Sequence, residues 1–147
     1  MAVIFPLDVG NVRHLCPTEV IFNLSSSNEN AGKHSYLRSL ISGLSSQGIC
    51  AYVYASSGYG ESSTDIVFTG KAFIAEAGEI VEEMERFRYE ERMIISDIDV
   101  SRIQTERLIN SSFKAAVTFH THDEKFNQLP FKLRSRQESL PMTRRVD

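Results

Sequence analysis

A short polar loop places two carboxylates and three hydroxyl groups between two apolar runs of the chain. Its residues are Glu61, Ser62, Ser63, Thr64 and Asp65. Polar side chains between core strands need hydrogen-bond partners, or they form a site. Glu61 and Asp65 could act as an acid–base pair. We favour the alternative that they hydrogen-bond the loop backbone or face a partner domain.

The two cysteines are the candidate nucleophiles. Cys50 lies inside an apolar run and is predicted to be an inert core thiol. Cys16 precedes Pro17, which favours an extended backbone, and no neighbouring group would lower its pKa. We expect a partly buried structural thiol at Cys16; its use by a divergent amidase is the alternative. Two cysteines do not form a disulfide framework.

Metal and phosphate sites are not expected. His120, His122 and Asp123 have metal-binding side chains, but no second pair of ligands accompanies them. Gly70 and Lys71 lack the surrounding residues of a phosphate-binding loop.

Short apolar runs predict the strands that would hold these residues. They lie at residues 1–6, 18–24, 49–55, 66–68 and 93–98. The run at residues 49–55 is bounded by small residues and is predicted to be buried on both faces. Residues 76–79 contain Gly78 and predict a hairpin turn between two further apolar runs.

Two helices are predicted from spacing. Apolar residues recur at three- and four-residue intervals over residues 34–47, and Gly48 is placed to end that helix. A second helix is expected over residues 100–108, with Ile103 and Arg107 on one face. From residue 111 onward the chain is polar and aperiodic, which indicates a linker or extended arm.

Three motifs in order resemble the glutaminase domain of glutamine-dependent NAD+ synthetase, a domain of the nitrilase superfamily. They are Asn-Leu-Ser-Ser-Ser-Asn-Glu at 23–29 followed by Gly-Lys at 32–33, Tyr-Val-Tyr-Ala-Ser with Gly-Tyr-Gly-Glu-Ser-Ser-Thr-Asp at 52–65, and Glu-Ala-Gly at 76–78 with Ser-Asp-Ile-Asp at 96–99. The resemblance implies an α/β fold: a partial nitrilase-superfamily α-β-β-α sandwich with an extended C-terminal arm. Residues 1–110 would be the C-terminal portion of the glutaminase domain, and residues 111–147 the arm leading to a synthetase domain.

The resemblance also implies a chemistry. The family releases ammonia from glutamine with a cysteine nucleophile, a glutamate base and an oxyanion-stabilising lysine, and uses ATP and Mg²⁺ to amidate nicotinic acid adenine dinucleotide. The three catalytic groups would lie upstream of Met1, so we expect no catalytic residue here and no activity of the chain alone. ATP and Mg²⁺ would belong to the synthetase domain, because its Ser-Gly-Gly-x-Asp-Ser motif does not occur in this sequence.

Ser27 and Lys33 match the family positions that contact the α-amino and α-carboxylate groups of glutamine. A hydroxyl and a cation suit such a zwitterion once water is excluded. From the residues alone, the alternative is an ordinary loop serine and an exposed lysine.

Composition sets the remaining expectations. A chain of 147 residues with 41% hydrophobic content and net charge −3 suits one globular domain and gives no field that would recruit nucleic acid or a membrane. No secretory leader is evident, so a cytoplasmic location is expected. The expected partners are glutamine and the other parts of the synthetase, or a second copy in a homo-oligomer. A non-catalytic assembly piece of a split synthetase is the alternative function.

Overall fold

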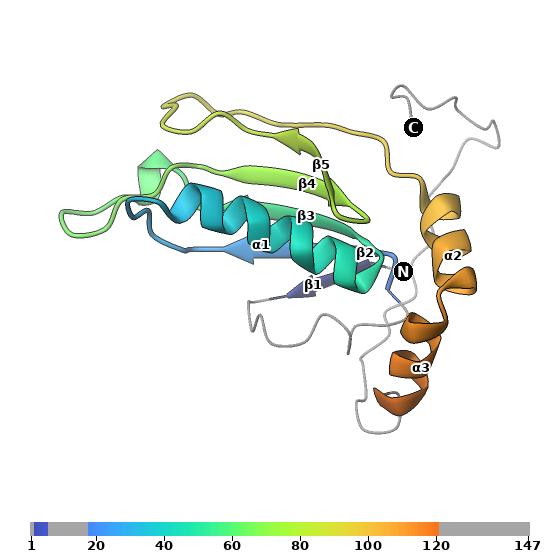
Figure 1. Ribbon diagram of the computed structural model, residues 1–147. Helices are drawn as coiled ribbons and strands as arrows, with labels where there is room; N and C mark the ends of the chain where they lie inside the picture. The colour runs from blue at the N-terminus through green and yellow to red at the C-terminus, as the bar shows by residue number, and fades with distance from the viewer. Residues whose placement is uncertain (1, 6–17, 121–147) are drawn as a thin grey trace.

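The computed structural model describes residues 2–5 and 18–120, which form one twisted sheet with a long helix on one face and two short helices at one end (Figure 1). The sheet has five strands in the order β1-β2-β3-β4-β5. They are β1 (Ala2–Phe5), β2 (Val20–Ser25), β3 (Ala51–Ser56), β4 (Ala72–Glu76) and β5 (Glu79–Glu83). The first three strands are parallel, and β4 and β5 run antiparallel to their neighbours.

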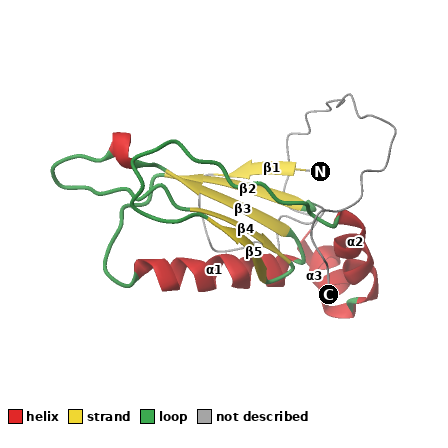
Figure 2. Cartoon of the chain, turned by 90° about the horizontal axis from the view of Figure 1, so that it is seen from above, coloured by secondary structure: helices red, strands yellow, loops and turns green. Residues whose placement is uncertain are grey.

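Helix α1 (Lys33–Gly48) packs along one face of the sheet, as Figure 2 shows. Its buried side chains meet alternate residues of β2, β3 and β4, which point to the same face because strand side chains alternate. The core residues are Ile21, Leu37, Ile41, Leu44, Cys50, Tyr52, Tyr54, Phe73 and Ala75. The predicted helix over 34–47 and the predicted strands over 1–6, 18–24 and 49–55 are confirmed to within two residues at most ends.

The end of α1 differs from the expectation in one respect. Gly48 is the last helical residue, but the left-handed backbone that closes the helix is at Ile49, with φ 42°. The side chain of Ile49 is buried, so packing decides the conformation against the usual preference for glycine.

The predicted hairpin turn is present between β4 and β5. Ala77 and Gly78 have φ values of 48° and 101°. A Cβ atom at Gly78 would lie 2.9 Å from the Cβ of Ser46 on α1, so this glycine is required by contact as well as by conformation.

Helix α2 (Val100–Ile109) lies where the sequence predicts a helix. The Asp99 side chain accepts a hydrogen bond from the Arg102 backbone N–H at 2.8 Å and caps its first turn. The buried carboxylate of Glu76 accepts from the Asp99 N–H at 2.9 Å, which fixes α2 against the end of β4. Ile103 is fully buried, and Arg107 on the same side donates to the backbone carbonyls of Ile49 and Thr18.

Two predicted strands are wrong. Residues 66–68 form part of an irregular loop, because the Ser63 N–H bonds the Ile66 carbonyl and closes a turn there. Residues 93–98 are not assigned to a strand, and Met93 and Ile95 are 78% and 74% exposed. The prediction of a strand at residues 93–98 rests on apolar side chains that would be buried, and Met93 and Ile95 are not.

The expected extended arm from residue 111 is also wrong for its first ten residues, which form helix α3 (Ser111–His120). Asn110 explains its start, because its side-chain oxygen accepts from the Phe113 N–H at 2.9 Å. The rest of the expected arm, residues 121–147, lies outside the described residues. No helix of the described ranges is both long and apolar enough to cross a membrane.

Candidate functional site

The structure brings Ser27 and Lys33 into direct contact at the end of β2 from which the chain enters α1. The Lys33 Nζ atom donates to the Ser27 Oγ atom at 2.7 Å. It also donates to the backbone carbonyl of Asn28, and its distance to the Asn28 Oδ1 atom is 3.3 Å. An ammonium has three N–H donors, and here three acceptor atoms surround it.

Lys33 is also the first residue of α1, so its charge adds to the positive end of the helix. The N-cap residue Gly32 provides no side-chain acceptor, and no acidic residue lies in the first turn. A helix start with an added lysine attracts an anion such as a carboxylate. The neighbouring hydroxyl of Ser27 and carbonyl of Asn28 can accept hydrogen bonds from an ammonium group.

Glu29 follows this cluster directly and points the other way, into the protein. Its backbone N–H donates to the Val67 carbonyl at 2.8 Å, and its carboxylate accepts from the Thr69 hydroxyl at 3.1 Å. The same carboxylate forms an ion pair with Lys71; the two side chains are only 11% and 5% exposed. Burial raises the pKa of Glu29, but hydrogen bonds from Lys71 and Thr69 and the charges of Lys71 and Arg86 outweigh it, so the pKa lies below the ordinary value.

The loop between β3 and β4, residues 57–71, projects from the same end of the sheet (Figure 1). Its base is closed by bonds from the Ser56 N–H to the Lys71 carbonyl and from the Gly70 N–H to the Ser57 carbonyl. It joins the first loop where the Ser57 N–H donates to the Ser25 carbonyl at 3.0 Å. The two polar loops that the sequence singled out are therefore neighbours.

The predicted polar residues of this loop have different surroundings. Ser62 lies at a turn and its hydroxyl accepts from the Phe68 N–H at 3.0 Å, whereas Glu61, Ser63, Thr64 and Asp65 are exposed. Within the described residues, no hydrogen bond or ion pair involves the carboxylates of Glu61 and Asp65. Both side chains are exposed, and the expected hydrogen bonds from the loop backbone to their carboxylates do not occur in the described part of the chain.

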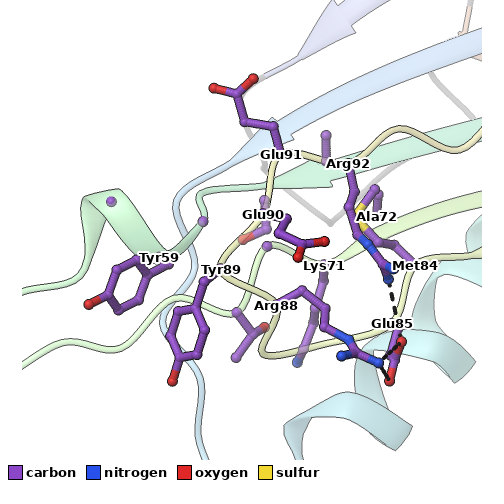
Figure 3. Close-up of a pocket in the computed structure, with 16 residues that line it drawn as sticks. Tyr59, Lys71, Ala72, Met84, Glu85, Arg88, Tyr89, Glu90, Glu91 and Arg92 are labelled. Carbon is purple, nitrogen blue, oxygen red and sulfur yellow. Dashed lines mark hydrogen bonds and ion pairs between the residues drawn. The ribbon is translucent and has the colours of Figure 1, made fainter.

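An open cavity of about 490 Å³ lies beside the base of this loop, and residues 84–85 and 88–92 line its other side (Figure 3). The rings of Tyr59 and Tyr89 meet edge to face on its rim, with centroids 4.6 Å apart. Arg88 donates to both carboxylate oxygens of Glu85 at 2.7 Å, and this bond holds the pKa of Glu85 below its usual range. Lys71 lines the cavity and also pairs with Glu29, which follows Ser27 and Asn28 in the chain.

The other candidate residues are only partly described. Cys50 is fully buried in the core, as predicted. Cys16, His122 and Asp123 lie outside the described residues, and only the backbone of His120 is described. Across residues 2–5 and 18–120, no group of three His, Cys, Asp or Glu side chains is arranged to hold a metal ion.

The sequence did not predict the pairing of Glu29 with Lys71. Glu29 belongs to the quoted motif at 23–29, but nothing in that motif indicates which way its side chain points. In the sequence, Lys71 stands out only beside Gly70, in a pair that lacks the rest of a phosphate-binding loop. Since the two residues are 42 positions apart, only the fold of the β3–β4 loop reveals the pair.

Comparison with known proteins relates the chain to one group of enzymes. No protein-family model matches the chain. It is 32% identical over 134 residues to the glutamine-dependent NAD(+) synthetases of Mycobacterium bovis and Mycobacterium leprae, an alignment that covers 90% of this chain. The same alignment covers 20% of those proteins, so the chain spans about a fifth of their length.

Solved structures give the fold. A carbon-nitrogen hydrolase from Helicobacter pylori matches 78% of this chain and 44% of its own, with TM-score 0.54 and 13% identity. A glutamine-dependent NAD+ synthetase from Acinetobacter baumannii matches 60% of this chain and 18% of its own, with TM-score 0.52 and 21% identity. The chain thus has part of the fold of a carbon–nitrogen hydrolase, and its sequence is similar to about a fifth of the glutamine-dependent NAD(+) synthetases.

Proposed function

We propose that this chain is the glutamine-binding part of the glutaminase domain of a glutamine-dependent NAD+ synthetase. In that enzyme, ammonia released from glutamine would amidate nicotinic acid adenine dinucleotide at the expense of ATP. The observation that supports the proposal is the contact of Lys33 with Ser27 and Asn28 at the start of α1. The ATP and Mg²⁺ would be bound by a synthetase domain, and the reaction would be cytoplasmic.

The roles of the residues follow from charge. Lys33 and the positive end of α1 would hold the α-carboxylate of glutamine. Ser27 and the Asn28 carbonyl, which accept from Lys33 in the free chain, would accept from the α-ammonium. On binding glutamine, the hydrogen bonds between Lys33 and these acceptors would therefore be replaced by charge-assisted hydrogen bonds to the ligand.

Titration of the ¹⁵N-labelled chain with L-glutamine tests this binding site. Backbone amide signals of residues 27–33 should shift with increasing ligand, and the Lys33→Ala variant should lose the response. Lys114→Ala is the matched control, because it removes an exposed lysine on α3 at the opposite end of the sheet. Equal responses of all three proteins, or no response of the unchanged chain, would contradict the proposal.

A second function is favoured by the sheet face that α1 does not cover. Phe22 and Leu24 point to that face and are 36% and 63% exposed, although they lie beside Val53 and Ala55 in the centre of the sheet. An apolar sheet face in this position needs a cover. We propose that it packs against the rest of a synthetase or against a second copy, so that the chain serves as an assembly piece.

Sedimentation velocity over a range of concentrations tests whether a second copy of the chain covers this face. Self-association through this face should disappear in the Phe22→Arg/Leu24→Arg variant. Tyr36→Arg, on the outer surface of α1, should associate like the unchanged chain. A monomer at all concentrations would exclude the second copy as the occupant, and self-association that persists in the double variant would exclude this face.

A further inference from the structure

Glu29 connects the two loops at the end of the sheet. Ser27 and Asn28 form the cradle of Lys33, and the next residue sends its side chain into the protein. Its carboxylate binds Lys71 and Thr69, which belong to the end of the β3–β4 loop. The residues that hold Glu29 therefore belong to a different loop from the residues that contact Lys33.

The strength of this connection comes from burial. The Lys71 and Glu29 side chains that form the ion pair are only 5% and 11% exposed. Removing one member of such a pair leaves the other as an uncompensated buried charge. By contrast, the Glu83 and Arg38 side chains that pair at the same end of α1 are 29% and 53% exposed, so this ion pair is worth little.

The backbone adds a second constraint at the same residue. The Glu29 N–H bonds the Val67 carbonyl, so the main chain and the side chain of Glu29 hold the same loop. A rotation of this residue would carry the Asn28 carbonyl with it, because the two share a peptide unit. The position of an acceptor of Lys33 thus depends on the contacts of Glu29.

We propose that Glu29 is a positioning residue for the substrate site: its ion pair with Lys71 holds the 26–30 loop so that Ser27 and Asn28 gather around Lys33. The inference rests on the proposed function for its link to glutamine, but the geometry of Lys33 is observable without any ligand. Glu29 itself touches no substrate in this scheme; it acts through Asn28 and Ser27.

The Lys33 ammonium can be observed directly by NMR in the full 147-residue chain. Hydrogen bonds to three acceptors slow its exchange with water, so its ¹⁵Nζ signal should be visible. Glu29→Gln should shift or abolish that signal. Thr69→Val, which removes one hydroxyl donor and keeps the ion pair, should shift it in the same direction by less. Glu83→Gln is the control and should leave the signal unchanged.

These measurements decide the proposal independently of glutamine. An unaltered Lys33 signal in both Glu29→Gln and Thr69→Val, or an equal change in Glu83→Gln, overturns it. If Glu29→Gln does not fold, as judged by its backbone amide spectrum, Thr69→Val decides alone. If glutamine binds, Glu29→Gln should weaken its affinity on the order of tenfold, as for residues of one contact network. If glutamine shifts no signal in the unchanged chain, the proposed function fails while the Lys33 signal still tests the positioning role.

Discussion

The guanidinium of Arg107 donates from its Nε atom to the Ile49 carbonyl at 2.9 Å and so joins α2 to the left-handed residue that ends α1. Its Nη2 atom donates to the carbonyls of Gly48 at 3.0 Å and Thr18 at 2.7 Å. One side chain thus satisfies three carbonyls where α1 ends and the chain approaches β2. The cation also lies at the negative end of the α1 dipole, where it is stabilising.

Arg107→Ala should lower the free energy of unfolding by about 2–4 kcal/mol, because three carbonyls lose charge-assisted hydrogen bonds and become buried without a donor. Urea unfolding followed by circular dichroism measures the change, with the slope in urea unaltered. Arg38→Ala, which breaks an exposed ion pair with Glu83, should cost less than about 1 kcal/mol. Equal losses in the two variants would contradict this assignment.

Gly78→Ala should destabilise the protein by about 2 kcal/mol or more, because φ is 101° and the new methyl group would meet Ser46. Gly43→Ala provides the opposite case within α1. Nothing lies within 4 Å of a Cβ built at Gly43, so alanine should stabilise the helix by up to about 1 kcal/mol. The midpoint temperature of thermal unfolding should therefore fall in Gly78→Ala and rise in Gly43→Ala.

The stability of the chain should fall in acid partly through Glu29. Its pKa is lower in the folded chain than in the unfolded chain. Its contribution to the free energy of unfolding is therefore fully present above the ordinary glutamate pKa of about 4.3. That contribution is lost as the pH falls through the lower folded pKa. Glu29→Gln should flatten the dependence of unfolding free energy on pH below about 4.3. Glu85→Gln is the control: that carboxylate is exposed, and its effect should vanish in high salt.

In an enzyme reassembled by fusing this chain to a nitrilase-like segment that carries the catalytic groups and to a synthetase domain, Lys33→Ala should raise KM for glutamine and leave kcat nearly unchanged. The lysine would hold the carboxylate equally in the ground and transition states. A charge-assisted contact of about 1.5–3 kcal/mol corresponds to one to two orders of magnitude. Ser27→Ala should cost about 1 kcal/mol. Synthesis from free ammonia should be the same in both variants, and an unaltered KM in both would refute the assignment.

Cys50 should resist alkylation in the native protein, because its thiol is fully buried in the core. Site-resolved mass spectrometry after iodoacetamide treatment should find Cys50 modified only when urea is present. Modification within minutes in native buffer would show that the core opens at β3 on that timescale.

Periodicity and apolar runs were enough to predict α1, α2, the first three strands and the β4–β5 hairpin. Helix α1 buries the face that its pattern indicates, with Leu37, Ile41 and Leu44 in the core. The pattern failed for residues 66–68 and 93–98, where apolar residues are exposed or held by loop hydrogen bonds. It also missed α3, whose start is set by one Asn110 side-chain bond that periodicity does not encode.

The candidate site was predictable in part for a similar reason. Ser27 and Lys33 are six residues apart in one motif, so their contact across a short loop is local. Glu29 and Lys71 meet only because the β3–β4 loop folds back on the end of β2. The end of α1 shows the same limit, since the left-handed Ile49 is held by Arg107, 58 residues away.

The buried pair of Glu29 and Lys71 also restricts how this chain can change over evolutionary time. A substitution at either position alone leaves an unpaired buried charge, a loss of about 3–5 kcal/mol that consumes much of the stability of a small domain. Descendants of this sequence should therefore keep both charges or lose both together, and intermediates with one charge should be rare. The two positions should covary although they lie far apart in the sequence, while exposed neighbours such as Asp65 drift independently.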